Sequence, residues 1–142
     1  MPIILEFDQQ LRCQLSELTE LHSQIDDFAA EAGVTSHEAF HVKLITEELF
    51  VNFVSYGKNP EGAMRVSIGV LPDRICIRTR DNGVAFNPTT MDSVDTEADL
   101  ENRPIGGLGI FLMMEIGDNL IYQRLLETNV VTVELFKSEQ QP

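Results

Sequence analysis

The spacing of the apolar side chains changes along this chain, from a helical period before residue 56 to a strand period after residue 62. The early apolar residues recur every three or four positions, as in Leu18, Leu21 and Ile25. Later apolar residues alternate with polar ones, as in Val66, Ile68 and Val70. Two amphipathic helices followed by a hairpin predict a sheet covered by helices on one face.

Turn and capping residues define the boundaries of the expected elements. Gly33 is placed to end the first helix, and Thr35 with Glu38 has the form of a capping box that opens the second. The sequence predicts, in order, a strand Ile3–Phe7, a helix from about Ser16 to Gly33, a helix to about Ser55, strands around 66–70 and 75–80, a loop 87–105, a helix Ile110–Ile116, and strands Leu120–Leu125 and Val130–Phe136 joined near Thr128–Asn129. We therefore expect one α/β domain over residues 1–142, an α+β two-layer sandwich with a mixed, mostly antiparallel sheet.

The charge of the chain limits its partners. With 23 acidic and 10 basic residues in 142, the formal net charge is −13. Nucleic-acid binding is not expected, because phosphate contacts require clustered Lys and Arg. The chain has no apolar run of about 20 residues and begins without a basic, cleavable leader, so we expect a cytoplasmic protein with no membrane span.

A carboxylate and an amide interrupt the second helix, which is otherwise apolar on most sides. Glu48 and Asn52 are one turn apart on the same face, whereas Lys43 and Glu47 mark the expected solvent side. Buried polar side chains need partners, and capping a neighbouring loop is one explanation. The alternative is a pair in which the amide oxygen binds Mg²⁺ and the carboxylate accepts a proton.

Two glycine-containing segments offer further candidate sites. Asp81 and Gly83 follow a strand, where they form either an ordinary turn or a close approach to a flat ligand such as adenine. Gly107 and Gly109 open a short helix, whose N–H groups can bind an anion. Each of these signals is weak by itself.

Taken in order, the three segments resemble the nucleotide-binding boxes of the GHKL ATPase superfamily. Glu48-x-x-x-Asn52 resembles its first box, Asp81-x-Gly83-x-x-Phe86 its second, and the segment Gly107 to Ile110 its third. Within that superfamily, the sequences 47–56 and 106–112 look most like those of bacterial anti-sigma factor serine kinases. This resemblance implies a Bergerat fold.

The resemblance also implies a role for each matching residue. Asn52 would bind the Mg²⁺ of a bound ATP, and Glu48 would be the general base. The other residues would contact the nucleotide: Asp81 the adenine amino group, Gly83 the ring, Gly107 and Gly109 the phosphates, Arg103 in a lid over 87–105 a phosphate, and Thr132 the adenine through water.

For function, the resemblance implies an ATP-dependent serine/threonine kinase that acts on a STAS-domain antagonist protein. Members of that family also bind a sigma factor and commonly act as homodimers. The alternative is a nucleotide-gated binding module that regulates a partner without phosphoryl transfer.

Overall fold

The computed structural model describes residues 5–90 and 107–137. The elements are β1 (Leu5–Arg12), α1 (Glu17–Ala32), α2 (Ser36–Tyr56), β2 (Ala63–Val70), β3 (Arg74–Asp81), a 3₁₀ turn η1 (Pro88–Thr90), α3 (Gly107–Ile116), β4 (Asn119–Leu125) and β5 (Thr128–Phe136). Every element predicted within these ranges is present.

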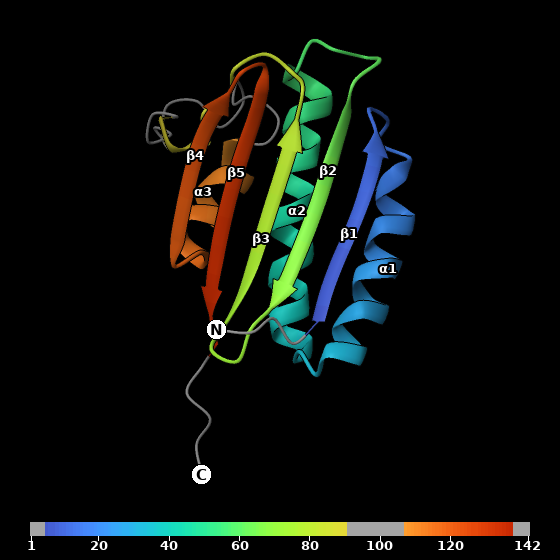
Figure 1. Cartoon of the computed structure of the whole chain (residues 1–142), viewed down its shortest axis with the longest axis vertical. Helices are drawn as coiled ribbons and strands as arrows, with labels where there is room; N and C mark the ends of the chain where they lie inside the picture. Colours follow the sequence, from blue (N-terminus) through green and yellow to red (C-terminus); the bar gives the residue numbers. More distant parts are fainter. Residues whose placement is uncertain (1–4, 91–106, 138–142) are drawn as a thin grey trace.

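The strands form one five-stranded sheet in the order β1-β2-β3-β5-β4. Each neighbouring pair is antiparallel, so the described sheet has no parallel pair and is simpler than the mixed sheet that was expected. All three helices lie on one face of the sheet, with α2 behind its centre (Figure 1). The predicted two-layer α+β architecture is confirmed.

The helix ends follow local hydrogen bonding. The capping box is present: Glu38 N–H donates to Thr35 Oγ1 at 3.0 Å, and Thr35 N–H donates to Glu38 Oε1 at 3.0 Å. Gly33 ends α1 with a left-handed φ of 73°. Ser16 is the N-cap residue of α1, but its side chain makes no capping hydrogen bond.

The last hairpin turns two residues earlier than the sequence indicates. The turn residues are Leu126, with a φ of 58°, and Glu127, whereas Thr128 and Asn129 already belong to β5. Asn129 therefore has the alternating side-chain direction of a strand residue and pairs with Asp81 of β3. This shift brings an amide into the interior.

Helix α2 is the central element of the core. Ile45 and Phe50 are completely buried, and the hydrophobic core continues onto the inner face of β2 and β3. Phe40, one of the apolar residues of this helix, is 57% exposed. Within the described residues, no helix is long and apolar enough to span a membrane.

Candidate functional site

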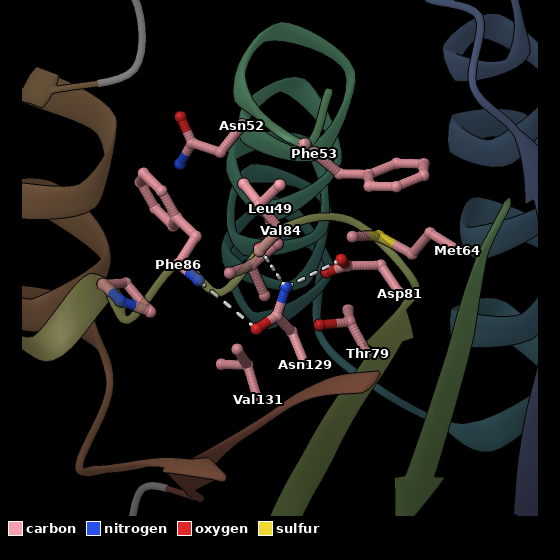
Figure 2. Close-up of a pocket in the computed structure, with 12 residues that line it drawn as sticks. Leu49, Asn52, Phe53, Met64, Thr79, Asp81, Val84, Phe86, Asn129 and Val131 are labelled. Carbon is pink, nitrogen blue, oxygen red and sulfur yellow. Dashed lines mark hydrogen bonds between the residues drawn. The ribbon is translucent and has the colours of Figure 1, made fainter. Parts of the chain in front are cut away.

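A pocket lies where the second half of α2 faces the ends of β3 and β5 (Figure 2). Residues from five parts of the chain line it, among them Asn52, Thr79, Asp81, Phe86 and Asn129. Its enclosed space of about 20 Å³ holds one or two water molecules. A nucleotide base would enter only if side chains that line the pocket moved.

The side chain of Asn52 is buried without a hydrogen-bond partner. It is 4% exposed, and neither its Oδ1 nor its Nδ2 has a partner among the described residues. An unpartnered buried amide destabilises a fold by about 1–3 kcal/mol. The loop-capping explanation therefore does not hold for Asn52 within the described residues, and a free amide oxygen fits a Mg²⁺ ligand.

Glu48, one turn earlier on α2, is half-buried, and its Oε2 is also buried without a partner in the described structure. Burial, with a smaller contribution from the Glu47 carboxylate, raises the pKa of Glu48. A carboxylate with a raised pKa and a free oxygen has the properties of a general base. Glu47 itself faces α1, where its Oε1 lies 3.1 Å from His22 Nε2.

Lys43 and Glu47, which mark the expected solvent side of α2, both contact α1. Lys43 Nζ contacts Asp26 Oδ1 of α1 at 2.9 Å, and Glu47 contacts His22 of the same helix. Both side chains thus connect α2 to α1 rather than to each other. Glu47 and Glu48 still differ in their surroundings: Glu47 contacts His22 of α1, whereas Glu48 Oε2 is buried without a partner among the described residues.

Asp81 is the last residue of β3, and its side chain lines the pocket. Its Oδ1 accepts hydrogen bonds from Gly83 N–H at 2.9 Å and from Asn129 Nδ2 at 3.0 Å. Burial raises the pKa of Asp81, and these two hydrogen bonds and the charge of Arg124 oppose the rise. A half-buried carboxylate with acceptor capacity to spare suits the exocyclic amine of an adenine.

Gly83 is required for packing against the end of α2. A Cβ on Gly83 would lie 2.8 Å from Gly57 Cα, 3.1 Å from Gly57 O and 3.1 Å from Asp81 Oδ1. Val84 N–H also donates to Gly57 O at 2.9 Å, which fixes the two segments together. The approach of a flat ligand to Gly83 stays a prediction, because the group that contacts Gly83 in the structure is the protein's own backbone.

We expect Gly83→Ala to destabilise the fold by about 1–3 kcal/mol, because backbone atoms have to shift to admit the methyl group. Denaturant unfolding of the ligand-free protein measures this. Val84→Ala is the control, since the neighbouring Val84 is 44% exposed and its truncation should change the free energy of unfolding little. Equal stability of Gly83→Ala and the natural protein would contradict the packing role.

The remaining predicted residues fall in three places. Gly107 and Gly109 lie in the first turn of α3. Arg103 and positions 91–105 of the expected lid lie outside the described residues. Thr132 is not at the pocket: it pairs with Arg78 on the helix-free face of the sheet, where its Oγ1 accepts a hydrogen bond from Arg78 Nε at 3.1 Å.

The structure adds two pocket residues that the sequence analysis did not select. Asn129 bonds Asp81, and Thr79 has a buried Oγ1 without a partner among the described residues. Thr79 is two residues before Asp81, so the strand period puts both on the inner face. The strand period could have identified Thr79 from the sequence. Asn129 was missed because the sequence analysis placed it in the hairpin turn rather than in β5.

These features define a class of protein. A two-layer α+β domain in which Asn52 of one helix and Asp81 of a strand line one pocket, with Glu48 one helical turn from Asn52, has the arrangement of an ATPase domain of the GHKL type. Residues 11–135 match the family described as the histidine kinase-like ATPase domain. The chain belongs to this family.

Curated proteins that are similar to this chain share one name, serine-protein kinase RsbW. The protein from Bacillus mycoides (strain KBAB4) is 30% identical over 100 residues, which cover 63% of this chain and 62% of the relative. The protein from Listeria monocytogenes (strain ATCC BAA-679 / EGD-e) is 28% identical over 102 residues, covering 68% and 65%. The chain thus spans somewhat less than two thirds of the length of these relatives.

Proposed function

We propose that this protein is an ATP-binding protein-serine/threonine kinase and anti-sigma regulatory factor. The observation that carries the proposal is the buried, unpartnered side chain of Asn52, one helical turn from Glu48 and in one pocket with Asp81. Membership of the ATPase family and the name shared by the relatives support it.

The pocket residues have distinct proposed roles in binding. Asp81 accepts a hydrogen bond from the adenine amine, and the Oδ1 of Asn52 is a ligand for Mg²⁺. Gly107 and Gly109 offer backbone N–H groups to phosphate oxygens at the start of α3. Arg103, the cation of the lid, is a further candidate for phosphate contact.

Phosphoryl transfer depends on positioning and on neutralising charge, so little covalent chemistry is required of the protein. Bound ATP and Mg²⁺ supply the phosphoryl group and much of the charge compensation. The contribution of the chain itself is Glu48, whose free Oε2 accepts the proton of the attacking serine or threonine hydroxyl. This oxygen is buried although the Glu48 side chain is half-buried, so water competes less for it.

The proposed substrate is a serine or threonine of a STAS-domain antagonist protein. The unphosphorylated antagonist would bind the kinase and release a sigma factor, and phosphorylation would reverse this exchange. We also propose that the kinase acts as a homodimer in the cytoplasm.

Two measurements with the purified chain test the proposal. Calorimetry should detect ATP binding that weakens when EDTA removes Mg²⁺, and labelled phosphate should pass from ATP to a purified STAS-domain antagonist protein. No binding at millimolar ATP would refute the nucleotide site. Binding without any transfer would instead favour the nucleotide-gated binding module.

A further inference from the structure

Asn129 is the most highly connected side chain of the pocket. It is 3% exposed, and its Nδ2 donates to Asp81 Oδ1 at 3.0 Å and to Val84 O at 2.8 Å. Its Oδ1 accepts from Phe86 N–H at 3.3 Å and from Tyr122 Oη at 2.6 Å. Figure 2 shows the amide between the Asp81 carboxylate and the segment that follows Gly83.

These partners fix the orientation of the amide. Two donors face Oδ1, the Phe86 N–H and the Tyr122 hydroxyl, and two acceptors face Nδ2. A flipped amide would place its NH₂ group against the Phe86 donor and its oxygen against the Asp81 and Val84 oxygens. Asn129 therefore presents a donor to Asp81 in one defined direction.

The orientation of Asn129 determines what Asp81 offers to a ligand. Both hydrogen bonds that the carboxylate accepts from the described residues, from Gly83 N–H and from Asn129 Nδ2, reach Oδ1. Oδ2 consequently keeps its acceptor capacity. Adenine presents an amine at its exocyclic position, and guanine presents a carbonyl oxygen there.

We propose that Asn129 is a specificity-determining residue, which aligns the Asp81 carboxylate as an acceptor and so selects an exocyclic amine over a carbonyl. This inference rests on the proposed nucleotide function and names the residue that sets its base selectivity. Asn129 acts through Asp81, so it is a positioning residue.

The electrostatics of the pocket support this assignment. Burial favours the protonated form of Asp81, which would carry an O–H donor and would suit a carbonyl oxygen instead. The hydrogen bond from Asn129 is the largest of the effects that oppose this rise in the pKa, followed by those of the Gly83 N–H and the Arg124 charge. Asn129 thus favours the form of Asp81 that accepts.

The hydroxyl of Thr79, which has no hydrogen-bond partner among the described residues, cannot provide this selection. Thr79 is 1% exposed and lines the same pocket. Its hydroxyl rotates and serves equally as donor or acceptor, so it fits either base. Discrimination between the two bases therefore depends on the fixed polarity of Asp81.

The test compares ATP and GTP dissociation constants for the natural protein, Asn129→Leu and Tyr122→Phe. We expect Asn129→Leu to lower the preference for ATP about tenfold or more, since a hydrogen bond to a charged group is lost. Tyr122→Phe should lower this preference less, because it removes only one of the two hydrogen bonds that Asn129 Oδ1 accepts. This variant conserves volume, so it tests the proposal even if Asn129→Leu fails to fold.

Asn119→Leu is the matched control. Asn119 also donates to a carboxylate, Glu134 Oε1 at 2.9 Å, but it is exposed at the other end of the hairpin. Its replacement should leave the ATP/GTP ratio unchanged. Carbon-detected NMR titration of the ligand-free protein is the second readout, and in Asn129→Leu the pKa of Asp81 should rise.

The outcomes separate this inference from the proposed function. If the natural protein binds neither nucleotide, the proposed function fails and the inference with it. If ATP binds but Asn129→Leu and Tyr122→Phe weaken ATP and GTP equally and leave the pKa of Asp81 unchanged, only the inference is overturned.

Discussion

Replacing Asp81 by Asn is expected to weaken ATP binding about 10- to 100-fold, the loss of one hydrogen bond to a charged group. The reason is geometric as well as electrostatic. Gly83 N–H and Asn129 Nδ2 both donate to Oδ1, so the carbonyl oxygen of the new amide has to take that position. Its NH₂ group then faces the adenine amine, donor against donor.

The same geometry predicts that Asp81→Asn weakens GTP binding less than ATP binding. An NH₂ group at the former Oδ2 position matches the carbonyl oxygen of GTP, so GTP should lose much less affinity than ATP in Asp81→Asn. Calorimetry with both nucleotides measures this. Asp73→Asn is the control, because it removes the same charge from an exposed residue that precedes β3, where Asp73 pairs with Arg74. Unchanged ATP affinity in Asp81→Asn would exclude Asp81 from the base site.

Much of the fold follows from local rules that the sequence displays directly. The Thr35–Glu38 capping box and the left-handed Gly33 depend on neighbours within four residues, and both are present. The helical period identified the shared face of Glu48 and Asn52 for the same reason. Elements defined by short-range hydrogen bonds and a regular period can be predicted without knowledge of the tertiary structure.

Two residues of β5 were misplaced relative to the pocket in the sequence analysis. Thr132 and Asn129 are three residues apart on β5, so they face opposite sides of the sheet. Moving the hairpin turn from 128–129 to 126–127 makes Asn129 a strand residue opposite Asp81. Thr132 alternates with the core residues Val131 and Val133, so it lies on the helix-free face beside Arg78. Tertiary pairing, rather than local composition, decides which polar side chain reaches the pocket.

Exposure of apolar residues is also a tertiary property. Phe40 lies on a helix that is apolar on most sides, and the pattern alone cannot say which of these sides other elements cover. In the structure α2 is covered along Ile45, Leu49 and Phe53, whereas Phe40 near its N-terminus is not.

The other large effect is expected for Glu48→Gln, which should lower the rate of phosphoryl transfer about 10²- to 10⁴-fold, the usual contribution of a general base. ATP affinity should change little, because the substitution conserves shape and Asn52 and Asp81 remain in place. Single-turnover transfer to the STAS-domain protein and ATP calorimetry separate the two steps. A variant that still transferred phosphate at the natural rate would show that Glu48 is not the base.

Glu48→Gln should also make the ligand-free fold more stable at neutral pH. The raised pKa of Glu48 means that the folded state binds its proton more tightly than the unfolded state. Stability from this group is therefore present below the unfolded pKa and is lost as the pH rises through the folded pKa, and a neutral amide avoids that loss. Glu47→Gln is the matched control: it removes the same charge from the adjacent residue, but Glu47 faces His22 on α1. We expect Glu47→Gln to retain phosphoryl transfer and to gain no stability, so that slower chemistry with a more stable fold marks Glu48 alone.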